Sequence, residues 1–325
     1  MSNASKKTVS IIVPCYNEAE VIEMFLEAVK QVAAGLPHYG FEFLFVDDGS
    51  QDGTEALLTG HAQADPRIKL ACLSRNYGHQ RAISAGLDLC TGHYAIVVDA
   101  DLQDPPERIP DILEQLEAGF DVVHMVRSDR RVDSLSKRFS AKLFYMLMRR
   151  WVLPDLPEDA GDFKGFSRPA IQALRQYRER VRFLRGLVAT LGFKQTRIPY
   201  VRAPRYAGKS KYPLRNVLRL ARDAIVSNTV LPLRLSLCLG LFVCALWPVL
   251  VVVGLVLAYV TGGVHQSLLW ALGVLMTGFF GIILLLFGIL GEYLKCVVLE
   301  VKQRPLYLVR RMHNLGPPPP QQHSR

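Results

Sequence analysis

The first candidate for chemistry is the acidic segment Asp99-Ala100-Asp101-Leu102-Gln103-Asp104. Asp99, Asp101 and Gln103 alternate with apolar residues, and all three side chains offer hard oxygen ligands. Such oxygens suit Mg²⁺ or Mn²⁺, which can bridge from the protein to a diphosphate. The segment therefore predicts a divalent-cation site. Asp104 precedes two prolines, and a turn or helix cap is the favoured interpretation of that residue.

Polar residues also follow other short apolar runs. These polar groups are Pro14-Cys15-Tyr16-Asn17-Glu18, Asp47-Asp48-Gly49-Ser50 and Arg127. The first group contains no GxGxxG, and GxxxxGK occurs nowhere, which disfavours a dinucleotide dehydrogenase and a P-loop kinase. Asp47-Asp48-Gly49 alone would indicate only a turn. Polar groups after four of the five short apolar runs indicate a shared nucleotide site instead.

A sheet must bring these segments together, and the N-terminal pattern predicts one. The predicted strands are Val9–Pro14, Phe41–Asp47, Ile68–Leu73, Tyr94–Asp99 and Phe120–Val126. The predicted helices between them are Ala19–Ala33, Gly53–Gln63, His79–Leu89 and Pro105–Glu117. Strands that alternate with helices predict an α/β fold with a mostly parallel sheet. Ligands bind outside the carboxyl ends of such strands, which is where the polar groups fall.

A long stretch without charge follows this region. No Lys, Arg, Asp or Glu occurs from Leu235 to Gly291, and a bilayer core needs about 20 apolar residues per helix. We predict transmembrane helices at 235–260 and 268–291. Basic residues flank both spans but are absent from the connecting turn, so the positive-inside rule places both termini in the cytosol. The predicted organisation is completed by a cytosolic domain over 1–212, a juxtamembrane amphipathic helix over 213–234 and a cytosolic tail over 292–325.

The net charge of +10 is explained by these flanking residues, because anionic lipid headgroups attract basic side chains. A nucleic-acid partner is the disfavoured alternative, so we expect a cytoplasmic-membrane protein that binds no nucleic acid. The six cysteines show no CxxC pair and no metal-ligand spacing, which indicates reduced packing residues.

Several motifs together carry a family resemblance. The chain resembles the GT-A fold glycosyltransferases of family 2, and within them the polyprenyl-phosphate glycosyltransferases, which include dolichol-phosphate mannose synthases and bacterial undecaprenyl-phosphate glucosyltransferases. The matching segments are Ile11–Glu18 (IIVPCYNE), Phe45–Thr54 (FVDDGSQDGT), Leu73–Gly78 (LSRNYG), Val98–Glu107 (VDADLQDPPE), Gly161–Arg168 (GDFKGFSR), Pro204–Lys211 (PRYAGKSK) and Gly291–Val309, which ends in RPLYLV. The resemblance covers nearly the whole chain, including both predicted spans.

The resemblance implies roles for the matching positions. The nucleoside would be held by Pro14, Tyr16, Glu18, Val46 and Asp48. The donor would contact Asp99, Ala100 and Asp101, and the metal would bind Asp101 and Gln103 together with Asp99. The phosphates of donor and acceptor would contact Arg127, Arg205 and Lys211, with Lys137 and Arg138 assisting at the acceptor. Asp162 would lie near the sugar, in a segment where relatives carry DFR and this chain has Lys164 in place of the arginine.

The expected reaction transfers a hexosyl-type sugar from a nucleotide-sugar, a UDP-sugar by analogy, to undecaprenyl or dolichyl phosphate during cell-envelope glycan synthesis. A phosphate monoester has a second pKa of about 6, so the acceptor is already largely dianionic at pH 7. We therefore expect direct displacement with inversion, with the acceptor phosphate as nucleophile. Asp162 would orient the sugar or the acceptor and would not remove a proton.

Three rival functions stay open. A processive polysaccharide synthase would carry QxxRW, but Leu147 occupies the glutamine position before Arg150-Trp151, and only two spans are predicted. An inactive membrane scaffold would not need the acidic segment or the pair Arg205 and Lys211. A soluble nucleotidyltransferase would leave the spans unexplained. The sugar, the nucleoside and the isoprenoid are undetermined, while relatives imply a homo-oligomer, with Arg304–Val309 as a candidate exchanged strand.

Overall fold

The structure is a computed structural model that describes residues 6–128, 160–179, 184–201, 229, 231–261 and 264–316. It divides into two compact units. The first comprises Met1–Arg219 and Pro305–Arg325, and the second comprises Leu220–Arg304. Most of the predicted juxtamembrane helix at 213–234 lies outside the described residues.

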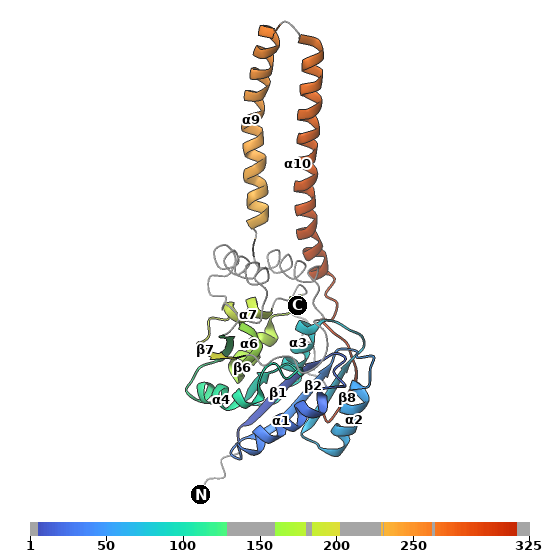
Figure 1. Cartoon of the computed structure of the whole chain (residues 1–325), viewed down its shortest axis with the longest axis vertical. Coiled ribbons are helices and arrows are strands. Elements are labelled where there is room, and N and C mark those ends of the chain that lie inside the picture. Colours follow the sequence, from blue (N-terminus) through green and yellow to red (C-terminus); the bar gives the residue numbers. More distant parts are fainter. Residues whose placement is uncertain are drawn as a thin grey trace. The chain divides into compact units, whose positions relative to one another are not determined.

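An eight-stranded sheet runs through the described residues of the first unit (Figure 1). Its strands are β1 (Thr8–Cys15), β2 (Gly40–Asp47), β3 (Ile68–Leu73), β4 (Tyr94–Val97), β5 (Val122–Arg127), β6 (Ala160–Ser167), β7 (Gln195–Tyr200) and β8 (Val309–His313). Their order across the sheet is β7-β5-β6-β4-β1-β2-β3-β8. Parallel pairs join β1 to β2 and β4, β2 to β3, and β5 to β7, whereas β6 and β8 run antiparallel to their neighbours. The predicted α/β fold with a mostly parallel sheet is confirmed.

Three strands were absent from the predicted set, namely β6, β7 and β8. The strand near the C-terminus begins at Val309, so placing a strand at Arg304–Val309 was wrong. It pairs with β3 of the same chain, where Ser74 N also donates to Leu308 O over 2.9 Å. The strand predicted at Tyr94–Asp99 ends earlier, at Val97, and Asp99 follows it in a loop.

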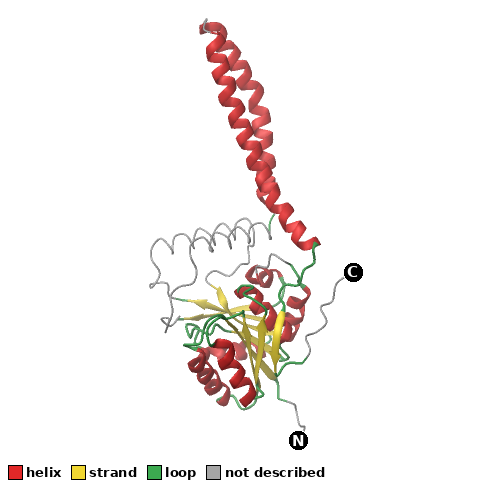
Figure 2. Cartoon of the chain, turned by 90° about the vertical axis from the view of Figure 1, so that its right-hand side faces the viewer, coloured by secondary structure: helices red, strands yellow, loops and turns green. Residues whose placement is uncertain are grey.

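Helices cover both faces of the sheet, as Figure 2 shows. They are α1 (Ile22–Ala34), α2 (Thr54–Ala64), α3 (His79–Leu89), the 3₁₀ turn η1 (Pro106–Arg108), α4 (Ile109–Glu117), α6 (Arg168–Gln176) and α7 (Leu184–Thr190). One core contains side chains of α1, α2 and α4, and the other contains side chains of α3, α6 and α7. Burial on both faces explains why the central strands are almost continuously apolar.

Helix α3 lies unusually close to the sheet. A Cβ on Gly86 would come within 2.2 Å of Ile12 Cγ2 and 3.5 Å of Val46 Cγ2. Glycine is therefore required for this approach. The close contact fixes the depth of α3 over β1 and β2, and hence the position of the residues that begin the helix.

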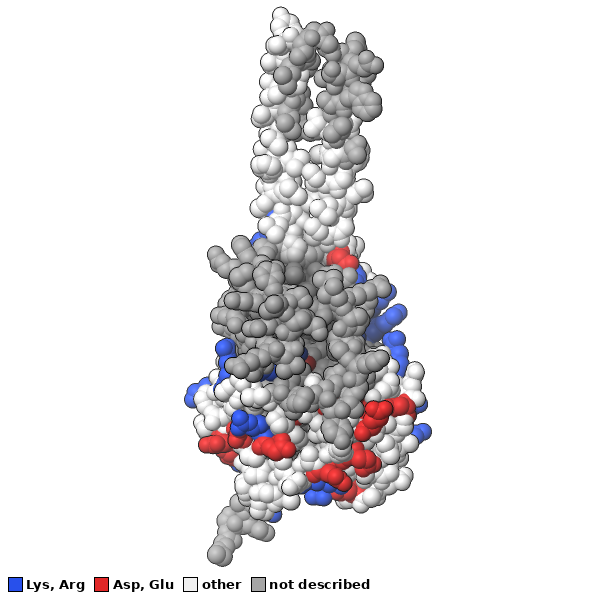
Figure 3. Space-filling view, in the orientation of Figure 1, with Lys and Arg blue, Asp and Glu red and all other residues white. Residues whose placement is uncertain are grey.

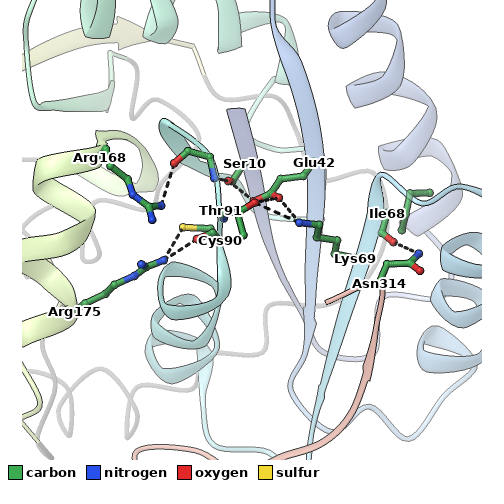
Figure 4. A network of polar contacts seen from close by, with 10 residues as sticks. Ser10, Glu42, Ile68, Lys69, Cys90, Thr91, Arg168, Arg175 and Asn314 are labelled. Carbon is green, nitrogen blue, oxygen red and sulfur yellow. Dashed lines mark hydrogen bonds and ion pairs between the residues drawn. The ribbon is translucent and has the colours of Figure 1, made fainter. Parts of the chain in front are cut away.

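A buried polar network lies near the amino ends of the parallel strands (Figure 4). Glu42 of β2 accepts hydrogen bonds from Ser10, Lys69 and both the backbone and the hydroxyl of Thr91. Gly92 N donates to Ser10 Oγ over 2.9 Å. Burial would raise the pKa of Glu42, but the bonds from Lys69, Ser10 and Thr91 outweigh burial and lower it.

The second unit contains two long helices, α9 (Leu231–Thr261) and α10 (Val264–Val301). The described apolar side chains on them are largely exposed, and Figure 3 shows almost no charge over most of the pair. Within the described residues, one stretch is long and apolar enough to cross a membrane, Gly278–Val301, and a shorter apolar helix spans Pro232–Val243.

The stretches predicted as transmembrane, 235–260 and 268–291, are thus helical, but two membrane crossings are not confirmed. Helix α10 also continues beyond Gly291 to Val301, so the predicted end of the second span falls inside a helix. Tyr293 Oη donates to Thr229 O over 2.7 Å, which ties this extension to the segment that precedes α9.

Candidate active site

The predicted polar groups meet at one edge of the sheet. Cys15 at the end of β1 pairs with Asp47 at the end of β2, and Ile12 pairs with Val97 at the end of β4. Asp99 follows β4, and Arg127 ends β5. Because β6 is antiparallel, Asp162 near its start lies toward this same edge. The strand-end edge therefore gathers the carboxylates and the arginine that the sequence predicted.

Asp162 has both carboxylate oxygens occupied. Arg185 of α7 donates through Nε to Oδ1 over 3.0 Å and through Nη2 to Oδ2 over 3.1 Å. Gln80 of α3 donates to Oδ2 over 3.2 Å. Burial would raise the pKa of Asp162, but Arg185 and His79 outweigh burial and hold it well below its usual value. A carboxylate kept ionised in this way is poorly suited to accept a proton.

His79 is the first residue of α3 and bridges two acids. Its Nε2 lies 3.2 Å from Asp162 Oδ2 and 3.4 Å from Asp99 Oδ1. Burial opposes the charged imidazole, but Asp99 and Asp162 outweigh it and raise the pKa of His79 to about 9. Gly78 precedes it at φ 97° and ψ 149°, a backbone region open essentially to glycine alone. The imidazolium is therefore a fixed positive charge between the two carboxylates.

Asp99 has the environment of a cation ligand. Burial raises its pKa to about 6; His79 opposes that shift, whereas Asp104, Asp162 and Asp101 add to it. Its Oδ1 is buried and accepts no hydrogen bond from the described residues, although His79 is an ion-pair partner. Several carboxylates around one under-bonded oxygen repel one another, and a divalent cation relieves that repulsion. The residues present fit the predicted metal.

The turn after Asp99 carries the other two predicted ligands. Leu102 lies between Asp101 and Gln103 with φ 56°, in the left-handed region that costs a non-glycine residue about 1–2 kcal/mol. Gln103 N donates to Asp101 Oδ1 over 3.2 Å, which closes the turn. Strain of this kind concentrates at functional sites. It is consistent with a turn shaped to present both side chains.

Asp104 was predicted to lie in a turn or to cap a helix, and it lies in the bend just before η1. The residue before η1 is Pro105, and no side-chain cap bond is present there. Asp104 is fully buried and instead accepts a hydrogen bond from Tyr200 Oη at the end of β7. Tyr200 pairs in register with Arg127. Burial opposes the charge of Arg127, but Tyr200 and Asp104 favour it and raise the pKa of Arg127.

The residues predicted to hold the nucleoside lie at the carboxyl ends of β1 and β2 and in the two loops that follow these strands. Pro14 pairs with Val46, and Asn17 N and Glu18 N donate to the hydroxyls of Ser50 and Thr54, which joins the two loops. The side chain of Val46 is fully buried beneath α3. Val46 can therefore contact a ligand only through its backbone atoms.

Asp48 is likewise buried and already holds a loop in place. It accepts hydrogen bonds from Tyr77 N over 2.7 Å and Gly78 N over 2.8 Å. Burial raises the pKa of Asp48, and these two backbone donors partly offset that shift. Asp48 thus positions the residues that lead into His79, in addition to any contact with a ligand.

A second acidic group lies close by and has its own partners. Ligand atoms of Asp47, Glu55 and Cys72 lie within 4.8 Å of one another. Asp47 already accepts from Ser50 N, and Glu55 pairs with Arg310 and Arg311.

The predicted cations Lys137, Arg138, Arg205 and Lys211 lie outside the described residues.

Comparison with known proteins identifies the family of this chain. Residues 10–175 match the model of glycosyl transferase family 2. The chain belongs to this family. The transferase is also 38% identical to an uncharacterized glycosyltransferase of Bacillus subtilis over 94% of each chain.

Two further relatives have more specific names. The transferase is 36% identical to the SfII prophage-derived bactoprenol glucosyl transferase of Shigella flexneri, over 95% of this chain and 99% of that one. It is 36% identical to a prophage bactoprenol glucosyl transferase homolog of Escherichia coli, over 94% and 99% of the two chains. The similarity therefore extends through the apolar helices, and the transferase has the GT-A-like α/β fold that the resemblance implied.

Sequence reasoning missed three side chains of the site: His79, Gln80 and Arg185. His79 was read only as the start of a helix, although an imidazole directly after a loop glycine at a strand-end edge is a usable signal. Gln80 and Arg185 reach Asp162 from α3 and α7, which come together only through packing on one face of the sheet. No local pattern marks that meeting.

Proposed function

We propose that this transferase moves a hexosyl unit from a UDP-sugar to a polyprenyl phosphate, undecaprenyl or dolichyl, with inversion at the anomeric carbon. The observation that carries the proposal is the end-to-end similarity to bactoprenol glucosyl transferases, which includes the apolar helices. A hydrophobic acceptor of that kind presents its phosphate at a membrane surface. An enzyme with exposed apolar helices can meet it there.

The state of Asp162 supports the proposed mechanism. Its oxygens are held by Arg185, Gln80 and His79, and its pKa lies well below the usual range. The acceptor needs no base, because a phosphate monoester with a second pKa of about 6 is already largely dianionic. An acceptor oxygen attacks the anomeric carbon, the bond to the nucleoside diphosphate breaks, and the electron pair leaves with that diphosphate.

Cations must hold the two phosphate groups against their mutual repulsion. Asp99, Asp101 and Gln103 would hold Mg²⁺ or Mn²⁺, whose bound form supplies positive charge for the leaving diphosphate. Arg127 lies at the same edge with its charged state favoured by Asp104 and Tyr200. Lys137, Arg138, Arg205 and Lys211 complete the proposed set. Alignment and charge stabilisation then supply the rate enhancement.

The direct test uses the purified full chain in detergent micelles with Mn²⁺ or Mg²⁺. UDP-glucose, UDP-N-acetylglucosamine and GDP-mannose are each incubated with undecaprenyl phosphate, and the lipid product is read by mass spectrometry. We expect one sugar phosphopolyprenol adduct, of β configuration by NMR if the donor is α-linked. Undecaprenol without its phosphate should give no product. Turnover to free sugar alone, or an equal yield with undecaprenol, would contradict the proposal.

We further propose that α9 and α10 both cross the cytoplasmic membrane, that the catalytic domain and both termini are cytosolic, and that the protein is a homo-oligomer. Support for the topology comes from the exposed apolar side chains and from the basic residues that flank the helices. Labelling of Gly262→Cys in intact cells by a membrane-impermeant maleimide tests it, with the unsubstituted chain as control. Labelling only after lysis would contradict two crossings.

A further inference from the structure

The side-chain amide of Gln80 links two elements of the site. Gln80 is the second residue of α3 and is partly buried. Its Nε2 donates to Asp162 Oδ2 of β6 over 3.2 Å, and its Oε1 accepts from Leu184 N over 3.3 Å. Leu184 begins α7, and the first N–H groups of a helix have no partner within that helix. One amide therefore joins a carboxylate of the sheet to the start of α7.

These contacts close a ring of hydrogen bonds. Arg185 follows Leu184 in the chain and donates to both oxygens of Asp162, over 3.0 Å to Oδ1 and 3.1 Å to Oδ2. The ring runs from Gln80 to Asp162, then to Arg185, back along the chain to Leu184, and again to Gln80. The χ2 torsion of an aspartate has only a broad preference of its own. Donors from α3 and α7 therefore set the plane of this carboxylate.

Gln80 stands on a rigid support. Gly86 lets α3 pack directly on β1, and Ser84 Oγ donates to Gln80 O over 2.7 Å within the helix. Leu184 is 3% exposed and lies in the same apolar core as the side chains of α3. Neither helix can shift far without disturbing that packing. The carboxamide of Gln80 thus transmits the position of two packed helices to Asp162.

A second glutamine holds α7 without contacting the site. Gln195 begins β7, at the opposite end of that strand from the strand-end edge, and its Nε2 donates to Val188 O of α7 over 2.9 Å. Its Oε1 lies 2.7 Å from Nε2 of the buried His124 on β5. Each glutamine therefore bonds to the backbone of α7 and to one side chain of the sheet. Of these two described glutamines, only Gln80 has Asp162 as that side chain.

We propose that Gln80 is a positioning residue for the transfer reaction, which acts by holding the carboxylate of Asp162 in its working orientation relative to α7. This inference rests on the proposed function, in which Asp162 orients the sugar or the acceptor. A displacement of about 1 Å at a positioning group can cost about 100-fold in rate. Arg185 and His79 still hold Asp162 when Gln80 is replaced, so the effect should be a reduced rate and not a complete loss.

The test compares Gln80→Met with Gln195→Met in the full chain in detergent. Each substitution removes one bond to the backbone of α7 and one to a side chain of the sheet. The donor is whichever of UDP-glucose, UDP-N-acetylglucosamine and GDP-mannose the unsubstituted chain uses best, and the acceptor is undecaprenyl phosphate. Steady-state kinetics, the melting temperature and binding of the matching nucleoside diphosphate with Mn²⁺ are measured for each variant.

We expect Gln80→Met to lower kcat by about tenfold to a hundredfold, because a bond to a charged group that orients a substrate is lost. Its affinity for the nucleoside diphosphate should stay within about twofold of that of the unsubstituted chain. Gln195→Met should keep kcat within about twofold, although both variants should lower the melting temperature by similar amounts.

Gln80→Glu separates the two contacts of the amide. An ionised carboxylate at this position can still accept from Leu184 N, but it can no longer donate to Asp162. It should lower kcat at least as far as Gln80→Met does, even though the bond to α7 is kept. This variant also decides the question if Gln80→Met does not fold by circular dichroism.

Three results would overturn the inference. Equal values of kcat per folded molecule in Gln80→Met and Gln195→Met would show that Gln80 does no more than hold α7. Normal kcat in Gln80→Glu would show that its bond to Asp162 is not needed. Nucleoside-diphosphate binding that weakens as much as kcat falls would show a general disruption of the site. If the unsubstituted chain transfers sugar normally, these results remove only the role of Gln80, whereas no transfer by that chain would remove the proposed function as well.

Discussion

The two ends of the parallel sheet each bury charged side chains, but they treat them in opposite ways. At the start of the strands, Glu42 is saturated with donors and its pKa is lowered (Figure 4). At the carboxyl ends, Asp99 has a buried oxygen that accepts no hydrogen bond from the described residues, and burial raises its pKa to about 6. Burial alone therefore does not mark a functional group. Incomplete satisfaction by the protein does, because it leaves a place for a ligand.

The largest expected effect separates the two ends by activity. Asp99→Asn should lower sugar transfer by about 100-fold to 1,000-fold, because it removes charge from the proposed cation site. The melting temperature should not fall, since a carboxyl whose pKa is raised in the fold destabilises the folded state when it ionises. Transfer assays and thermal denaturation in the same detergent measure both effects. A large loss of stability would instead show that Asp99, like Glu42, stabilises the fold.

The converse substitution is Glu42→Gln. It should destabilise the fold by about 2–4 kcal/mol, because Lys69 loses its buried partner and one accepting oxygen becomes a donor. Activity per folded molecule should stay within twofold. The pKa of Glu42 is lowered in the fold, so its contribution is present above the unfolded value near 4.5 and is lost as pH falls through the folded value. Chemical denaturation at pH 7 and at lower pH checks this sign.

A substitution at Lys164 tests whether a buried charge at the carboxyl ends of the strands lowers the stability of the fold. It lies on β6 two residues from Asp162 and is 3% exposed; burial lowers its pKa to about 8, although Asp162 partly offsets that shift. Lys164→Met should therefore stabilise the fold at pH 7 by an amount on the order of 3 kcal/mol.

The advantage of Lys164→Met should shrink as pH rises from about 8 to 10.5, where the folded protein releases the lysine proton before the unfolded chain does. Comparing the variant with the unsubstituted chain cancels the titration of His79, which is common to both. A variant that is less stable than the unsubstituted chain at pH 7 would show that the ammonium group contributes favourably to the fold.

The smallest effect concerns the far end of α3. Tyr307 Oη donates to Asp88 Oδ2 over 2.8 Å, alongside the ion pair with Arg178. Tyr307→Phe should cost about 1 kcal/mol of stability through the lost hydrogen bond, with no change in the KM for donor or acceptor. Denaturation and steady-state kinetics measure the two quantities. A changed KM would mean that the two ends of α3 are coupled.

The sequence predicted what depends on local periodicity. Strands β1, β2, β3 and β5 and helices α1 to α4 were placed near their observed bounds, because apolar runs alternate with helical patterns there. Strand β6 was missed because Asp162 and Lys164 occupy inward positions and glycines interrupt its apolar residues. Strand β8 was missed because Arg310 and Arg311 give an edge strand a polar pattern.

The residues of the site also fall into those that local sequence patterns could place and those that they could not. Asp99, Asp101, Gln103, Arg127 and Asp48 could be placed at one edge from topology alone, since parallel strands bring their carboxyl ends together. The partners of Asp162 could not, because α3 and α7 approach it through tertiary packing. The burial of Val46 and the contact of Asp104 with Tyr200 are likewise long-range outcomes.

Strand β8 has a consequence for biosynthesis. It covers the edge of β3, yet it is encoded after α9 and α10. At a synthesis rate of about 5–20 residues per second, the edge of β3 stays uncovered for a time on the order of tens of seconds after it emerges. An uncovered strand edge is prone to wrong pairing. The sheet of the catalytic domain is therefore completed only after both apolar helices have been translated.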